Sequence, residues 1–153
     1  MAELIAKRLR DPDGRILLQH EGHDLSDRLL SIWARDVSER AEGTPNSPAG
    51  ILAPSGFEFA AALTGIWAAG RIAVPLQPAH PIEELQYVVQ DTGMDLILAH
   101  PRELARAHEL ARVTGARVAE VTLPESRSET IETFSGDGAL IIYTSGTTSR
   151  PKG

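Results

Sequence analysis

The chain has 153 residues, of which 42% are hydrophobic and 24% charged, and its formal net charge is −6. This length is typical of one domain with a sizeable core, and the acidic balance argues against nucleic acid as a partner, because phosphate backbones are bound by excess basic charge. The absence of cysteine excludes disulfides, thiolate zinc sites and cysteine nucleophiles. No apolar run approaches the roughly 20 residues of a membrane-spanning helix, and the start lacks the apolar region of a secretory signal. We therefore expect a cytoplasmic protein without a transmembrane segment.

Strands and helices are predicted to alternate along most of the chain. Residues 15–20 are predicted to form a strand, and residues 25–41 an amphipathic helix capped by Asp24 or Ser26. The later strands are expected at 51–53, 72–74, 95–99, 117–123 and 139–143, and the later helices at 57–69, 82–91 and 102–114. These strands are short continuous apolar runs, which is typical of parallel strands covered by helices. The fold class is therefore predicted as α/β, a parallel sheet with helices on both faces.

Several single residues carry further expectations. The two tryptophans, Trp33 and Trp67, lie on apolar helix faces and are predicted to be core residues, and His108 is expected on the core side of its helix. Glycine fits the left-handed position just after a helix, so four glycines are expected to end helices: Gly43, Gly70, Gly93 and Gly115. The acidic and basic clusters of the middle of the chain are expected to be solvated surface: Glu83, Glu84, Asp91, Asp95, Arg102, Arg106, Arg112 and Arg117.

His20 and His23 form an HxxH pair close to two acidic residues. Such a pair could contribute to a metal site, but no third ligand has a clear spacing. A turn between a strand and a helix is the favoured interpretation.

The stretch of greatest chemical interest follows the last predicted strand and reads TSGTTSRPKG, residues 144–153. Ligands of open parallel sheets bind outside the carboxyl ends of the strands, where this stretch is expected. Glycine lets the backbone approach a ligand, successive N–H groups form an anion site, and Lys152 adds a positive charge. A Walker A loop is excluded, because its lysine is followed by serine or threonine and Lys152 is followed by Gly153. From the residue types alone, this stretch could be either a polyphosphate-binding site or a polar surface loop.

The whole string ALIIYTSGTTSRPKG, residues 139–153, closely resembles the AMP-binding signature of the adenylate-forming enzymes. This superfamily comprises the acyl-CoA synthetases, the firefly luciferases and the adenylation domains of nonribosomal peptide synthesis. Its pattern is approximately YTSGTTGxPKG, and Ser149 stands where glycine is usual. Residues 50–99 are similar to the early sheet-and-helix region of acyl-CoA synthetases, including malonyl-CoA synthetase-like members. The resemblance covers nearly the whole chain but only about the first third of the family's usual length.

The resemblance implies an ATP-dependent acyl-activating ligase, with ATP, Mg²⁺ and coenzyme A as cofactors or substrates. A carboxylic acid would react with ATP to give an acyl-adenylate and pyrophosphate, and the thiol of coenzyme A would then form a thioester, as in fatty acid metabolism. The residues carried over as phosphate-binding are Thr144, Ser145, Gly146, Thr147, Thr148 and Lys152.

The family's catalytic, metal-binding and acyl-pocket residues lie downstream of the signature. The resemblance therefore implies that residues 1–153 are the N-terminal part of an AMP-dependent synthetase/ligase domain, truncated at the phosphate-binding loop. They would hold no catalytic or metal-binding residue, would need the remaining C-terminal part of the enzyme as a partner and would be inactive alone. Two alternatives remain open, a non-catalytic nucleotide- or phosphate-binding module and a structural remnant without a ligand.

Overall fold

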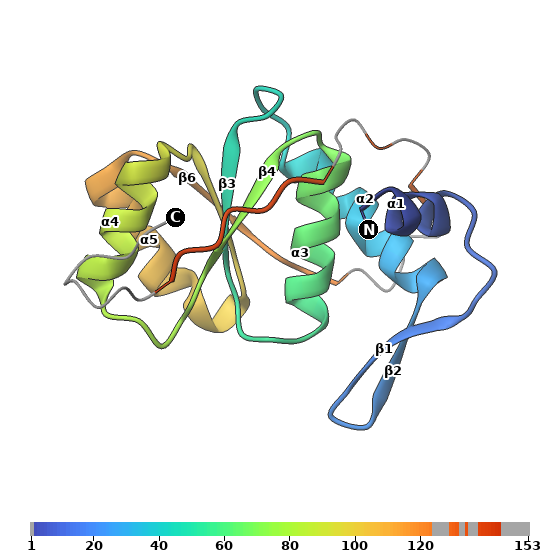
Figure 1. The fold of residues 1–153 in the computed structure, drawn as a ribbon. Helices are drawn as coiled ribbons and strands as arrows, with labels where there is room; N and C mark the ends of the chain where they lie inside the picture. The colour runs from blue at the N-terminus through green and yellow to red at the C-terminus, as the bar shows by residue number, and fades with distance from the viewer. Residues whose placement is uncertain (1, 124–128, 132–133, 135–137, 145–153) are drawn as a thin grey trace.

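The structure, a computed structural model, describes residues 2–123, 129–131, 134 and 138–144. A four-stranded sheet runs through its centre, with helices on either side (Figure 1). The helices are α1 (Ala2–Arg10), α2 (Asp27–Arg40), α3 (Phe57–Ala68), α4 (Ile82–Thr92) and α5 (Leu104–Thr114), and a short 3-10 helix, η1 (Pro101–Glu103), precedes α5. The strands are β1 (Ile16–His20), β2 (His23–Ser26), β3 (Pro48–Leu52), β4 (Ile72–Leu76), β5 (Leu96–Ala99) and β6 (Arg117–Glu120).

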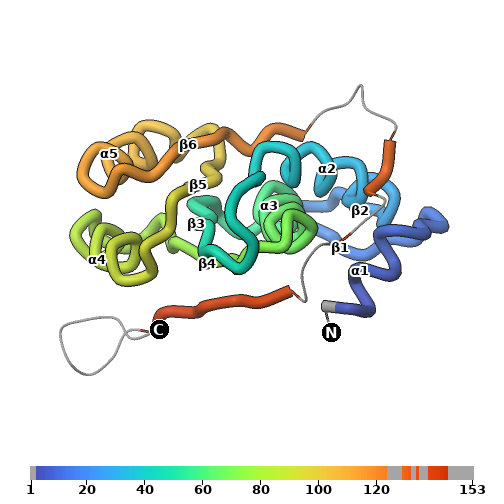
Figure 2. Tube along the Cα trace, turned by 90° about the horizontal axis from the view of Figure 1, so that it is seen from above, coloured from blue at the N-terminus to red at the C-terminus, as the bar shows by residue number. Residues whose placement is uncertain are grey.

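The central sheet has the strand order β4-β3-β5-β6, and every pair in it is parallel. Successive side chains of each strand point to opposite faces, so the sheet separates two hydrophobic cores. On one face, Ile51 and Leu98 pack with α2 and α3, and on the other, Leu52 and Ile97 pack with α4 and α5. The same division into layers is visible in Figure 2. The predicted fold class, a parallel sheet with helices on both faces, is confirmed.

The elements predicted between residues 15 and 123 are also found in the predicted order, with differences at several ends and with one additional strand, β2. Ser26 is the N-cap of α2, and its hydroxyl accepts a hydrogen bond from the N–H of Leu29. Gly93 and Gly115 are left-handed C-caps, with φ of 64° and 78°. Gly43 does not end a helix, because α2 stops at Arg40 and its C-cap is Ala41, with φ of −86°. His108 is exposed rather than directed at the core.

The N-terminal segment holds two elements that the sequence patterns did not indicate, α1 and β2. β2 pairs antiparallel with β1 in a hairpin that projects from the body of the molecule (Figure 1). Glu21 and Gly22 form its turn with φ of 48° and 80°. His20 and His23 therefore face each other across a hairpin, and the expected turn from a strand into a helix is corrected to a turn between two strands.

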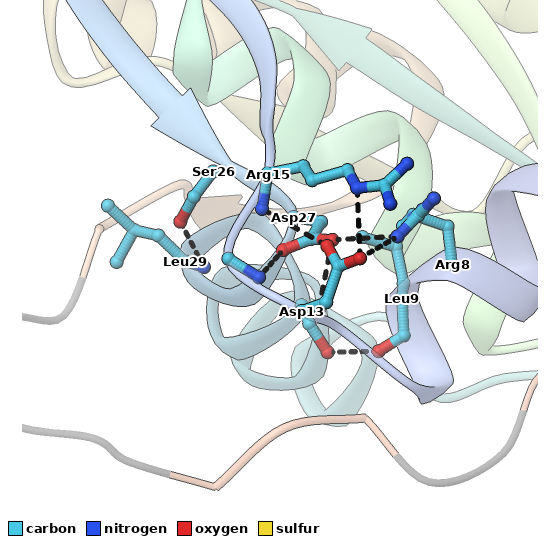
Figure 3. A network of polar contacts seen from close by, with 9 residues as sticks. Arg8, Leu9, Asp13, Arg15, Ser26, Asp27 and Leu29 are labelled. Atoms are coloured by element: carbon cyan, nitrogen blue, oxygen red, sulfur yellow. Dashed lines mark hydrogen bonds and ion pairs between the residues drawn. The ribbon is translucent and has the colours of Figure 1, made fainter.

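A polar network joins α1 to α2 (Figure 3). The buried carboxylate of Asp27, at the start of α2, accepts hydrogen bonds from the N–H groups of Gly14 at 2.8 Å and Asp13 at 3.2 Å. The buried hydroxyl of Ser31 donates to the carbonyl of Leu9 at 2.6 Å. Partial desolvation acts to raise the pKa of Asp13, but the hydrogen bonds and charges of Arg8 and Arg15 hold it below its ordinary value. The network thus fixes the position of α1 on the body.

A second polar cluster lies at the amino ends of the central strands, around the fully buried side chain of Arg71. Its guanidinium donates to the carbonyls of Pro48 at 2.8 Å and Ala41 at 3.2 Å, and it pairs with Asp95. Asp95 was expected on a solvated surface, and its side chain is indeed 56% exposed, but it contacts this buried cation. The cluster ties the starts of β3, β4 and β5 together.

The segment 138–144 runs along the outer edge of β4, as Figure 2 shows in red. Its pairing with β4 is a single parallel bridge, between Leu140 and Ala73, instead of the strand predicted over 139–143. The peptide groups of a strand face its two neighbours alternately, so after Ala73 the next β4 residue to face this segment is Pro75. Proline has no N–H to donate, which explains why the pairing does not continue.

Candidate functional site

The candidate site lies where segment 138–144 reaches the carboxyl edge of the sheet. The carbonyl of Ala139 accepts two hydrogen bonds, from the N–H of Ala73 at 3.0 Å and from the indole of Trp67 at 2.9 Å. The N–H of Ile141 then donates to the carbonyl of Ala73 at 2.9 Å. Because the segment is parallel to β4, its later residues approach the carboxyl ends of the central strands. In open parallel sheets this is the edge at which ligands bind.

Tyr143 anchors the end of this segment. Its ring packs against the core beneath α4 and α5, and its hydroxyl donates a hydrogen bond to a carboxylate oxygen of Asp91, near the end of α4. Burial, followed by this hydrogen bond and by the negative charges of Asp91 and ionised Tyr87, raises the pKa of Tyr143 to about 12. The hydroxyl therefore keeps its proton, and its role as a donor, throughout the physiological pH range.

A cavity of about 270 Å³ opens beside Tyr143. Its walls come from the end of β4, the following loop, α4 and the last segment, and its lining consists of Pro75, Leu76, Gln77, His80, Glu84, Leu85, Val88, Ile142 and Tyr143. The loop after β4 is held by Arg106 of α5, whose guanidinium donates to the carbonyls of Pro78 and His80. Arg106 was expected at the surface, but it is half-buried in this role.

Only the first of the predicted phosphate-binding residues falls within the described part of the chain. Thr144 directly follows Tyr143 and is exposed at the candidate site. The others lie outside the described residues: Ser145, Gly146, Thr147, Thr148 and Lys152. Their assignment stays a prediction. Sequence reasoning missed Asp91 as a site residue, and no local pattern around it would have indicated a contact with Tyr143, 52 residues away.

Other candidates in the described part of the chain remain structural. Trp33 and Trp67 are buried, as predicted. No group of three or more metal-ligating side chains converges among the described residues, the His20–His23 hairpin included. Within those residues no helix is both long and apolar enough to cross a membrane.

The sequence matches the family described as AMP-binding enzyme over residues 39–153. Gramicidin S synthase 2 of Brevibacillus brevis is 30% identical over 154 residues, which cover 99% of this chain and 4% of that protein. Malonate–CoA ligase of Arabidopsis thaliana is 36% identical over 118 residues, which cover 68% of this chain and 19% of that protein. The chain thus spans a small part of the length of these relatives.

Solved structures show the same fold. The anthranilate CoA ligase AuaEII, in complex with anthranoyl-AMP, superposes with a TM-score of 0.77 at 16% identity, over 98% of this chain and 33% of that chain. ATP-bound MatB from Rhodopseudomonas palustris superposes with a TM-score of 0.76 at 23% identity, over 99% of this chain and 34% of that chain. The family match over residues 39–153 and the curated relatives confirm the resemblance that the signature suggested. The chain belongs to the AMP-binding enzyme family of adenylate-forming synthetases and ligases.

Proposed function

We propose that residues 1–153 form the N-terminal part of an AMP-dependent synthetase/ligase domain and that the whole protein activates a carboxylic acid with ATP. The observation that carries this proposal is the direction of segment 138–144. Parallel pairing at Ala73 leads Thr144 to the carboxyl edge of the sheet, and the sequence after Thr144 is rich in hydroxyl groups and contains Gly146 and Lys152. Such a stretch suits a polyphosphate at an edge where ligands bind.

In the proposed reaction an oxygen of the carboxylate attacks the α-phosphorus of ATP. The bond between that phosphorus and the bridging oxygen breaks, and pyrophosphate leaves with the electron pair. In a second step a thiol, proposed to be that of coenzyme A, attacks the acyl carbonyl, releases AMP and forms a thioester. The relatives include both a gramicidin synthase and a CoA ligase. Coenzyme A as the acceptor is therefore a more specific proposal than the formation of an acyl-adenylate.

The residues of this chain would contribute binding and charge neutralisation. Hydroxyl and N–H groups of Thr144, Ser145, Gly146, Thr147 and Thr148 would donate to the β- and γ-phosphates, and Lys152 would offset the charge of the departing pyrophosphate. Mg²⁺ would arrive with ATP as the MgATP complex. No ligand set for Mg²⁺ is assigned, because the described residues hold no cluster of acidic or histidine side chains for it.

Exchange of labelled pyrophosphate into ATP tests the proposal. We expect no acid-dependent exchange by residues 1–153 alone, and clear exchange by a polypeptide that continues through the rest of the domain. In that longer polypeptide, Lys152→Ala should slow exchange roughly 100-fold, because it removes a charge that acts on the transition state. Lys7→Ala is the matched control, since Lys7, the chain's other lysine, is exposed on α1. Equal exchange by both variants would remove Lys152 from the mechanism.

Nucleotide binding without exchange would favour a different function. If the longer polypeptide binds MgATP but exchanges no pyrophosphate with any acid, the chain belongs to a non-catalytic nucleotide-binding module. A folded protein that responds to no nucleotide would contradict both interpretations.

A further inference from the structure

We propose that the β1–β2 hairpin carries a docking surface for the part of the domain that follows residue 153. The inference rests on the proposed function, because that function makes residues 1–153 the first part of a longer domain. The surface consists of three apolar side chains of β1, Ile16, Leu17 and Leu18, and we call it the hairpin patch. It lies outside the signature, and no step of the proposed reaction uses it.

The hairpin patch is exposed over a whole strand. All five residues of β1 are exposed, and the exposed fractions of Ile16, Leu17 and Leu18 are 56%, 39% and 42%. Single exposed apolar side chains are common, whereas a contiguous group of them marks an interaction surface. β1 also contains no lysine, arginine, acidic residue or proline, the residues that usually protect an exposed strand from association. The composition of the patch therefore suits a surface that becomes covered.

The hairpin is weakly held by the body of the molecule. Of its residues, 16–26, all of which the structure describes, only Leu25 is buried. The ring of His20 makes an edge-on contact with the ring of Phe57, with 6.0 Å between the ring centroids. A two-stranded hairpin is marginally stable in water by itself, and a covering layer stabilises it. A partner on the hairpin patch would supply that layer.

The position of the hairpin indicates which segment covers it. His20 contacts Phe57, the first residue of α3, and α3 begins just after β3 has reached the carboxyl edge of the sheet. A Cβ atom added to Gly56, the N-cap of α3, would lie 3.4 Å from Nε2 of His20. Thr144 approaches the same edge, because segment 138–144 is parallel to β4. A polypeptide that continues the domain from this edge thus starts on the side of the sheet to which the hairpin projects (Figure 1).

The solved structures with this fold contain a partner of sufficient size. AuaEII and ATP-bound MatB superpose over 98% and 99% of this chain, but over 33% and 34% of their own chains. About two thirds of each of those chains therefore lies outside the matched part. A segment linked in the same polypeptide meets the hairpin patch at a high effective concentration, so even a small apolar surface can dock it.

A second copy of the chain fits this surface less well. Pairing of β1 with β1 of another copy would need a regular free edge, but the register between β1 and β2 shifts between Ile16 and Leu18. Such a bulge twists an edge strand and disfavours the addition of another strand. The patch therefore suits packing of side chains under a covering segment rather than pairing of two strand edges.

Hydrogen exchange measured by mass spectrometry tests the inference in two polypeptides, residues 1–153 and the longer polypeptide that continues through the rest of the domain. We expect the amides of residues 16–26 to exchange at least about tenfold more slowly in the longer polypeptide, the factor that burial of one large apolar side chain provides. In the longer polypeptide Ile16→Thr, which keeps a β-branched side chain but removes apolar surface, should reverse most of this protection. In residues 1–153 the same change should alter the hydrogen exchange of the hairpin by about twofold or less, because Ile16 is exposed there.

Val113→Thr is the matched control. Val113 has the same exposed fraction as Ile16, 56%, and it lies on α5, which packs on the opposite face of the sheet from Leu25 of the hairpin. Val113→Thr should leave the hydrogen exchange of residues 16–26 unchanged in both polypeptides.

Photocross-linking identifies the covering segment directly. A photoreactive p-benzoylphenylalanine in place of Leu17 in the longer polypeptide should form cross-links within one molecule, to peptides that follow residue 153. Cross-links between two copies would overturn the inference in favour of a second copy as the partner, and the absence of any cross-link would overturn it as well.

The outcomes separate the inference from the proposed function. If the longer polypeptide exchanges pyrophosphate into ATP but its hairpin amides are no better protected than those of residues 1–153, the inference is wrong and the proposed function stands. If the hairpin is protected and cross-linked as expected but no acid supports pyrophosphate exchange, the inference stands and the proposed activation of a carboxylic acid fails.

Discussion

Replacing Gly65 with alanine probes the contact between α2 and α3. Gly65 is buried in the middle of α3, and a Cβ atom added there would lie 2.5 Å from both Cβ and Cγ1 of Val37 and 3.0 Å from the carbonyl oxygen of Ala34. Carbon atoms in contact are normally about 3.5 to 4.0 Å apart, so the overlap is roughly 1 Å. Rotation of a side chain cannot relieve this overlap, because Cβ of Val37 is bonded directly to the backbone and the oxygen of Ala34 is part of the backbone. The two helices would have to separate.

The size of the effect follows from two opposing contributions. Overpacking of a core costs about 3 kcal/mol when the backbone must shift, whereas alanine in place of glycine within a helix returns about 1 kcal/mol. We therefore expect Gly65→Ala to lower the free energy of unfolding by about 2 kcal/mol. Urea unfolding followed by tryptophan fluorescence measures this directly, because Trp33 and Trp67 lie on the two helices concerned.

A matched comparison is available at Gly50 in β3. An added Cβ there would lie 2.7 Å from Sδ of Met94 and 2.9 Å from Cδ1 of Leu76, both at the far ends of flexible side chains. These atoms can move at a lower cost than backbone, so Gly50→Ala should be less destabilising than Gly65→Ala. The reasoning is refuted if Gly65→Ala is as stable as the wild type, or if the order of the two variants is reversed.

Three further predictions concern polar groups. Arg71→Met should destabilise the fold by about 3 kcal/mol in urea unfolding, because it removes the donor to the carbonyls of Ala41, at the end of α2, and Pro48, at the start of β3. Asp95→Asn should cost about 1 kcal/mol or less, because that side chain is 56% exposed. Asp27→Ala should destabilise by about 2 kcal/mol and speed hydrogen exchange of the Gly14 amide, which donates to this carboxylate; unchanged exchange would contradict the network. The pKa of Tyr143 is raised from 10.0 to about 12 in the folded chain, so the unfolded state releases this proton first and stability should fall as pH rises from about 10 to 12. Tyr143→Phe should lack that part of the alkaline loss in unfolding curves.

The regular part of the fold was predictable because its signals are local. Short apolar runs marked β3 to β6, and the glycines at positions 93 and 115 marked helix ends that the structure confirms. α1 escaped prediction because its stability comes from distant contacts, namely the burial of Leu9 and the hydrogen bond from Ser31 to its carbonyl. The hairpin escaped because Glu21 and Gly22 fit a turn into the following helix as well as a turn between two strands.

The candidate site was predictable only in part, for a related reason. The signature after Tyr143 could be recognised from residue types and spacing alone, and the comparisons bear out the family it indicates. The partners of Tyr143 and Arg71 could not, because Asp91 and Asp95 belong to other elements and look like ordinary surface carboxylates in the sequence. The single bridge at Leu140 likewise depends on Pro75 in a neighbouring strand.

The single bridge between Leu140 and Ala73 also bears on the order of folding. Pairing of β3 with β4 and of β5 with β6 joins residues fewer than 30 positions apart, and pairing of β3 with β5 joins residues fewer than 50 apart. The bridge joins residues more than 60 positions apart and gains only a few hydrogen bonds. The edge segment is therefore expected to dock after the sheet and its helices have formed. Slow docking of this segment would show as a late kinetic phase reported by the indole of Trp67, which donates a hydrogen bond to the Ala139 carbonyl.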